Sequence, residues 1–144
     1  MTSPRLRAFG ASAGVLAALV AVPAAQAQPT AAHPTDDLSP SVLTLTFAQG
    51  DSLDTASSQR TVLLICSPSV LGTHPATAAA CDELNTAGGD FERLSGHPMR
   101  FCTMIYDPVT VAADGVWHGN PVSYRHTYPN KCQAENRSTY VFAF

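Results

Sequence analysis

Apolar and polar positions begin to alternate at residue 41, and this period of two predicts a strand with one buried face. The alternating residues are Leu43, Thr44, Leu45, Thr46 and Phe47. A polar stretch rich in Ser, Asp and Thr follows at 49–60 and predicts a loop. The continuous apolar run within 61–66 then predicts a second strand, buried on both faces of a sheet.

The strongest helical pattern covers residues 75–87. This stretch is rich in alanine and starts with a proline, which is harmless at the first helical position, while Thr73 or His74 is placed to cap the helix. Gly88 and Gly89 predict its end. Helical spacing brings a small apolar group to one face, which we expect to meet the sheet: Ala80, Cys81, Leu84 and Ala87.

The C-terminal half of the chain predicts the rest of the fold. Its elements are a loop at 94–100, a connection at 101–107 closed by Pro108, a hairpin of strands 109–117 and 122–128, a short helix near 131–137 and a last strand at 139–144. Together the elements predict an α+β fold, in which about five antiparallel strands form one sheet with a main and a short helix packed on one face.

The first 27 residues predict a signal peptide. Arg5 and Arg7 supply the positive start, residues 8–25 the apolar core, and residues 25–27 (Ala-Gln-Ala) a small-x-small cleavage site. No later apolar stretch approaches the ~18–20 residues of a membrane-spanning helix. We therefore expect cleavage after Ala27 and a secreted, extracellular product.

The part after the signal peptide suits one domain. Residues 28–40 contain three prolines and almost nothing to bury, so we expect a flexible N-terminal arm. Patterned structure starts at Ser41, which gives a domain of residues 41–144.

The charge and the histidine content limit which partners and cofactors we expect. Eight basic residues stand against eleven acidic ones, and without Arg5 and Arg7 the remaining six give a net charge of −5. The basic residues are scattered, which argues against nucleic acid and anionic membranes as partners. The five histidines show no close pair with the spacing of metal ligands, so we expect no metal and no cofactor.

The cysteines point to a disulfide framework. All four follow the signal peptide: Cys66, Cys81, Cys102 and Cys132. An even number in a small secreted domain is typical of structural disulfides, and four cysteines allow three pairings. Whatever its partner, a bridged Cys102 would fix the backbone beside the bulky residues at 103–106. A rigid backbone beside an exposed apolar side chain is what a protein needs to offer itself to another protein's pocket.

The sequence around Cys66 and Cys81 carries a distinctive motif. Residues 66–75 read Cys-Ser-Pro-Ser-Val-Leu-Gly-Thr-His-Pro, and residues 80–84 read Ala-Cys-Asp-Glu-Leu. At every position these residues resemble the Cys-x-Pro, Gly-x-His-Pro and Ala-Cys-Asp-x-Leu pattern of the Streptomyces subtilisin inhibitor family. Further similar stretches are 88–90 (Gly-Gly-Asp), 104–108 (Met-x-Tyr-Asp-Pro), 114–117 (Asp-Gly-Val-Trp), 122–124 (Val-Ser-Tyr) and 141–144 (Val-Phe-Ala-Phe). The resemblance covers nearly all of the chain from Leu38 onward.

The resemblance implies a secreted inhibitor of subtilisin-like serine proteases, usually a homodimer, with no catalysis of its own. It implies the pairings Cys66–Cys81 and Cys102–Cys132 and a reactive bond between Met104 and Ile105. It also implies that Asn130 supports the loop from behind. The residues expected to contact the protease are Phe101, Cys102, Thr103, Met104, Ile105 and Tyr106.

The side chains of this loop predict specificity. Met104 is unbranched, apolar and uncharged, which suits a broad hydrophobic pocket and not the pocket of trypsin. Phe101 would fill a further hydrophobic pocket of the protease. We expect stronger inhibition of subtilisin-like and chymotrypsin-like enzymes than of trypsin.

Two other readings compete with inhibition. Thr103 stands where the family usually has proline, so the loop is less stiff, and the chain could be a secreted structural or substrate protein that keeps the family fold without inhibiting. A small secreted hydrolase is the third reading. The only nucleophile-elbow pattern, residues 10–14 (Gly-Ala-Ser-Ala-Gly), lies inside the signal peptide, so this reading has no support from the mature chain.

Overall fold

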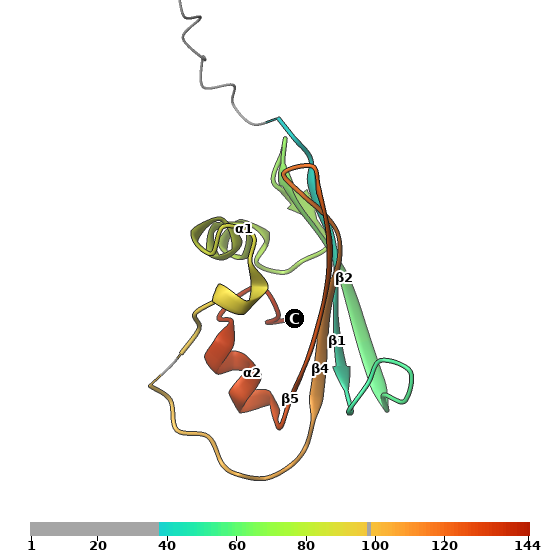
Figure 1. Ribbon diagram of the computed structural model, residues 1–144, viewed down its shortest axis with the longest axis vertical. Coiled ribbons are helices and arrows are strands. Elements are labelled where there is room, and N and C mark those ends of the chain that lie inside the picture. The colour runs from blue at the N-terminus through green and yellow to red at the C-terminus, as the bar shows by residue number, and fades with distance from the viewer. Residues whose placement is uncertain (1–37, 98) are drawn as a thin grey trace, which may run out of the picture. The chain divides into compact units, whose positions relative to one another are not determined.

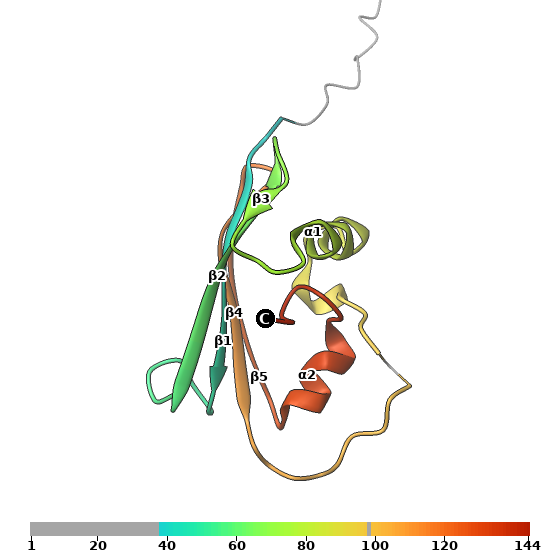
Figure 2. The same cartoon turned by 180° about the vertical axis from the view of Figure 1, so that it is seen from behind.

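A five-stranded antiparallel sheet supports the molecule, with its strands in the order β3-β2-β1-β4-β5. The strands are β1 (Ser41–Gln49), β2 (Ser58–Ser67), β3 (Leu71–Gly72), β4 (Val109–Trp117) and β5 (Asn120–Tyr128). Two α-helices, α1 (Thr77–Thr86) and α2 (Lys131–Arg137), lie on one face of the sheet (Figures 1 and 2). The predicted α+β class is confirmed.

This computed structural model describes residues 38–97 and 99–144, all within one compact unit, His33–Phe144. The expected signal peptide, 1–27, and most of the expected arm, 28–40, lie outside the described residues.

The core lies between the sheet and the helices. Alternate residues of β1 and β4 point into it, with Leu43, Leu45, Val109 and Val111 at most 1% exposed. The helix face predicted for α1 is confirmed, because Ala80, Cys81 and Leu84 are buried there.

Strand β2 differs from its prediction in length and burial. It starts at Ser58, inside the expected loop, because the register with β1 continues to the pair Gln49–Ser58. We predicted burial on both faces, but Leu64 is buried while its neighbour Leu63 is 36% exposed. Since both helices lie on one side, alternate residues of β2 remain accessible on the other.

The start of α1 is braced by His74 and not capped by a side chain. The helix begins at Thr77, two residues after the predicted proline start. His74 is buried, and its Nδ1 accepts a hydrogen bond from the Ala76 N–H at 3.0 Å. The Thr77 hydroxyl donates to the His74 carbonyl at 2.8 Å. Gly88 and Gly89 end the helix as predicted, with φ of 67° and 78°.

The prediction of a last strand at 139–144 is wrong, so the five strands that form the sheet are not the five that we predicted. The fifth strand is the short β3, where Gly72 has φ 131° and lies so close to β2 that a Cβ would come within 2.1 Å of the Leu63 carbonyl oxygen. The C-terminal segment turns instead of extending because the Glu83 carboxylate accepts hydrogen bonds from three successive N–H groups, at 139, 140 and 141. In a strand, successive N–H groups point to opposite sides.

Candidate functional site

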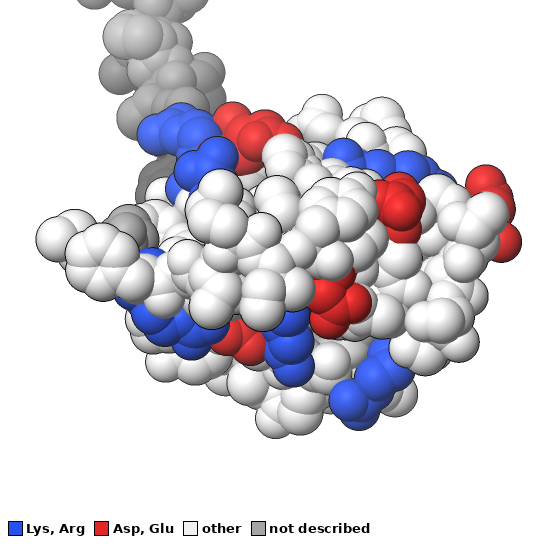
Figure 3. Space-filling model, turned by 90° about the horizontal axis from the view of Figure 1, so that it is seen from below, with Lys and Arg blue, Asp and Glu red and all other residues white. Residues whose placement is uncertain are grey.

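The segment 99–107 connects the helical layer to β4 as an irregular loop at the end of the molecule (Figure 1). Its apolar side chains are exposed, with Phe101 at 100%, Met104 at 91%, Tyr106 at 68% and Ile105 at 67%. Seen from this end, uncharged side chains occupy the middle of the surface and charged ones are scattered around them (Figure 3). Exposed apolar side chains gathered on one segment mark a surface for binding another molecule.

Disulfides fix the loop and the helical layer. Cys102 pairs with Cys132 of α2, with 5.7 Å between their Cα atoms, and Cys66 pairs with Cys81 of α1. These are the pairings that the resemblance implied. The first bridge holds the backbone two residues before Met104, and the second joins β2 to the helix that covers it.

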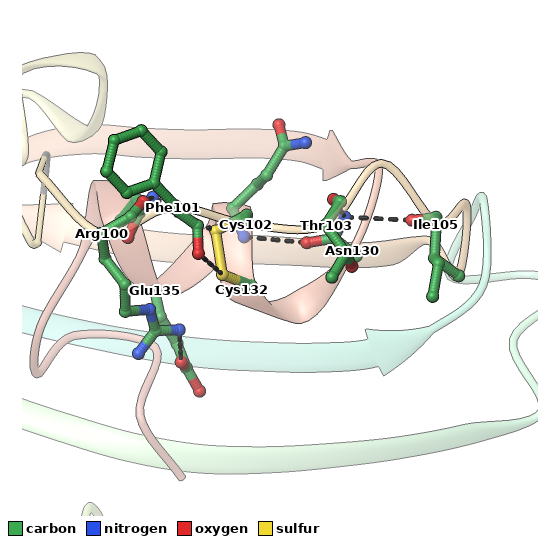
Figure 4. The surroundings of a disulfide bond; sticks show 10 residues. Arg100, Phe101, Cys102, Thr103, Ile105, Asn130, Cys132 and Glu135 are labelled. Atoms are coloured by element: carbon green, nitrogen blue, oxygen red, sulfur yellow. Dashed lines mark hydrogen bonds and ion pairs between the residues drawn. A yellow bond between two sulfur atoms is a disulfide. The ribbon is translucent and has the colours of Figure 1, made fainter.

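Asn130 lies behind the loop and contacts it on both sides of Met104 (Figure 4). Its Nδ2 donates to the Thr103 carbonyl at 3.1 Å and to the Ile105 carbonyl at 3.0 Å. The side chain is itself held, because Asn130 is 7% exposed and its Oδ1 accepts from the Gln133 N–H at 3.0 Å as the N-cap of α2. One amide thus joins a helix start to the backbone around the expected reactive bond.

The C-terminal side of the loop rests on the β1–β2 connection. The Tyr106 hydroxyl donates to the Asp51 carboxylate, and this hydrogen bond is the main reason that the pKa of Tyr106 is raised. Gln49 Nε2 donates to Asp107 Oδ1 at 2.8 Å. The Asp107 N–H donates to the Pro129 carbonyl at 2.9 Å.

The N-terminal side of the loop rests on α2. The Arg100 guanidinium forms an ion pair with the Glu135 carboxylate, and the two side chains point toward each other in Figure 4. Asn136 Nδ2 donates to the Arg100 carbonyl at 2.8 Å.

Sequence reasoning missed part of this support. It identified the loop and Asn130, but not Gln49, Asp51, Glu135 or Asn136. No local pattern marks them, since each lies 35 or more residues from its loop partner and only the fold brings the pairs together. A motif shared with a family can be recognised in the sequence. A single polar residue in a connection or on a short helix gives no indication of which residue it will contact in the fold.

In the part of the chain that the structure describes, no three His, Cys, Asp or Glu side chains form a group that could hold a metal ion. Across the same residues, no helix is long and apolar enough to cross a membrane.

A small, disulfide-linked domain that holds one apolar segment exposed and supports it from both sides belongs to the class of binding proteins that present a loop to a partner. The sequence model of the subtilisin inhibitor-like family matches residues 39–130. The chain belongs to this family.

The chain is similar to proteins of two Streptomyces species. A subtilisin inhibitor-like protein of Streptomyces rochei is 49% identical over 105 residues, which cover 73% of this chain and 93% of that protein. A trypsin inhibitor of Streptomyces longisporus is 46% identical over 121 residues, covering 84% and 83%.

A solved structure is similar in fold. It contains sermetstatin of Streptomyces caespitosus in complex with subtilisin of Bacillus licheniformis. The match has a TM-score of 0.65 at 41% identity and covers 73% of this chain and 99% of the other.

Proposed function

We propose that this protein is a secreted inhibitor of subtilisin-like serine proteases that binds as a substrate does. The loop 101–106 would occupy the protease's substrate groove, with Met104–Ile105 as the reactive bond. The observation that carries this proposal is the pair of hydrogen bonds from Asn130 to the carbonyls of Thr103 and Ile105, which hold the backbone around a Met104 side chain that is 91% exposed.

Support on both sides of the bond is what distinguishes an inhibitor from a substrate. A protease binds its substrate as an extended strand, and a loop that is already ordered avoids roughly 0.5–1.5 kcal/mol for each side chain otherwise immobilised. After a cut at Met104–Ile105, the disulfide and Asn130 would keep both new ends in place. Religation would then compete with release, so turnover would be slow.

The exposed side chains support a preference for hydrophobic pockets. Met104 would fill the primary specificity pocket, and Phe101, three residues earlier, a further hydrophobic pocket. We therefore propose tighter inhibition of subtilisin-like and chymotrypsin-like enzymes than of trypsin. Nanomolar inhibition of trypsin equal to that of subtilisin would contradict the assignment of Met104.

Titration of residues 28–144 against active subtilisin tests the function, with mass spectrometry of the mixture over hours. Stoichiometric loss of activity with an intact chain, or one cut only at Met104–Ile105, is the expected result. Full protease activity with progressive degradation of the chain would support the alternative of a non-inhibitory secreted protein, which the less rigid Thr103 keeps in view.

Secretion and assembly complete the proposal. We infer that residues 1–27 are removed after Ala27, and N-terminal sequencing of the secreted protein tests this.

Homodimer formation is consistent with the sheet face that the helices leave open, where Thr44 and Leu63 are exposed neighbours on β1 and β2. Sedimentation as a monomer at micromolar concentration would contradict the dimer.

A further inference from the structure

We propose that Asn136 and Glu135 position the Phe101 side chain for its partner, as a second anchor of the loop that is separate from Asn130 and the disulfide. This inference rests on the proposed function, since it assigns residues of α2 to the presentation of the same loop. It concerns the N-terminal side of the loop, where Phe101 is fully exposed.

Asn136 holds the backbone immediately before Phe101. Its Nδ2 donates to the Arg100 carbonyl at 2.8 Å and lies 3.3 Å from the Cys102 sulfur. Only the amide nitrogen can donate, so this orientation is the one that satisfies two loop acceptors. The peptide group between Arg100 and Phe101 is therefore fixed to α2.

The other end of the Asn136 amide argues against a purely structural role. Its Oδ1 is buried and has no hydrogen-bond partner among the residues that the structure describes. A buried acceptor without a partner destabilises a fold, and alanine is the better helix former. An asparagine here gains nothing for the helix itself, and its contribution lies in the hydrogen bond to the loop.

Glu135 holds the side chain of the same loop residue. Its carboxylate pairs with the Arg100 guanidinium, with the side chains 34% and 43% exposed, and Lys131 Nζ lies 3.9 Å from the other carboxylate oxygen. Arg100 is thus held at its carbonyl by Asn136 and, as Figure 4 shows, at its side chain by the preceding residue, Glu135.

The two anchors lie on either side of Phe101. Arg100 is held before it, and Cys102 is held after it by the disulfide to Cys132. Phe101 itself is 100% exposed, so no protein contact fixes its ring, and its direction depends on these two neighbours. In Figure 4 the ring projects away from the side of the loop on which Arg100 meets Glu135.

A double-mutant cycle with Phe101→Ala tests the inference. Asn136→Ala, and Asn136→Asp as a variant of equal shape without donors, should each raise the inhibition constant for subtilisin about fivefold, the value of one hydrogen bond. In the Phe101→Ala background the same substitutions should change it less than twofold, because nothing remains to be positioned. Glu135→Gln should raise the constant by about twofold, and Arg137→Gln, the control for loss of one charge on the same helix, should not.

Two further readouts separate positioning from stability. The midpoint of thermal unfolding should stay the same or rise in Asn136→Ala, and amide exchange at 101 and 102 should accelerate in the free protein. Equal effects of Asn136→Ala with and without Phe101, an unchanged inhibition constant, or a loss of inhibition that follows a loss of stability would each overturn the inference. Wild type that leaves subtilisin active would overturn the proposed function first, and this inference with it.

Discussion

Thr103 is the loop residue whose chemistry decides how firmly the backbone is held beside Met104. Its side chain is exposed and its carbonyl accepts one of the two Asn130 hydrogen bonds. A β-branched residue favours an extended backbone, but proline fixes φ and leaves the unfolded chain fewer conformations. The loop therefore depends more on its hydrogen bonds than a loop with proline at this position would.

We expect Thr103→Pro to slow cleavage at Met104–Ile105. The gain of about 0.4–1 kcal/mol from a restricted backbone corresponds to a two- to fivefold lower rate. Mass spectrometry of the inhibitor during incubation with catalytic amounts of subtilisin measures it. An unchanged or faster rate would count against the argument from stiffness.

His74 is a buried titratable residue away from the loop. Its Nε2 lies 3.2 Å from the Val141 carbonyl oxygen, and its ring packs edge-on against Phe144 at 5.4 Å between centroids. Since Nδ1 accepts from a backbone N–H, Nε2 carries the proton in the neutral ring. Burial lowers the pKa of His74 below 6.5, although the hydrogen bonds to the backbone oppose the shift.

His74 should make the fold sensitive to mild acid. As the pH falls below 6.5, the unfolded chain takes up a proton that the folded protein resists, so the free energy of unfolding decreases until the folded pKa is reached. We expect His74→Gln to be about 1–3 kcal/mol less stable than wild type at neutral pH. That difference should narrow in acid when urea unfolding is measured at both pH values. A difference that is constant with pH would mean that His74 does not titrate between the two states.

At the scale of elements, α2 is a short helix whose start serves the loop. Asn130 uses its oxygen to cap the helix and its nitrogen to hold the carbonyls of Thr103 and Ile105. The two roles fall on different atoms of one side chain, so different substitutions can separate them.

Asn130→Asp and Asn130→Ala should separate capping from loop support. Aspartate keeps the capping acceptor and loses the donor, while alanine loses both, at an additional cost of about 0.5–2 kcal/mol in stability. We expect faster cleavage at Met104–Ile105 in both variants and a clear fall in unfolding temperature only for alanine. Wild-type resistance to cleavage in Asn130→Asp would contradict the role given to the nitrogen.

Regular elements could be predicted from the sequence, and elements made by distant contacts could not. The hairpin of β4 and β5 could be predicted, although β5 starts at Asn120 and not at residue 122, and α1 could be predicted from its alanine content and terminal glycines. Strand β3 has only two residues, which are too few to show a period. The segment 139–144 has residues typical of strands, but its hydrogen bonds to the Glu83 carboxylate make it turn. Its Val141 and Phe142 still enter the core, so the apolar pattern indicated burial correctly but not shape.

The candidate site shows the same division. Its position came from a motif shared with a family, and its cysteine pairs from the same resemblance. The hydrogen bonds that Asp51 and Asn136 form with the loop depend on where the β1–β2 connection and α2 lie in the fold. No local sequence pattern predicts these positions.

At the scale of the whole molecule, the loop is part of a closed ring of chain. The bridge between Cys102 and Cys132 spans 30 residues and encloses β4 and β5, so the sheet itself forms the base that holds the loop. Motion of the loop at Cys102 must therefore move α2 or break the bridge.

Replacing both cysteines of this bridge with alanine should turn the inhibitor into a substrate. Opening a ring of this size costs about 3–4 kcal/mol, while the core and the Cys66–Cys81 bridge remain. We expect a folded protein by circular dichroism at 25 °C, a lower unfolding temperature and rapid cleavage by subtilisin. Slow cleavage, as in wild type, would mean that the hydrogen bonds alone hold the loop.

The Asn136 amide also makes the strength of inhibition depend on the kind of cell that secretes the protein. Asn136-Arg137-Ser138 is an acceptor triplet for N-linked sugar in eukaryotic secretion. A glycan would be attached through the same nitrogen that donates to the Arg100 carbonyl, and would place a bulky group beside the Cys102 sulfur. Protein secreted from yeast or animal cells would then carry the sugar on the anchoring nitrogen and keep one N–H of its two, whereas bacterial secretion leaves both N–H groups available to hold the loop.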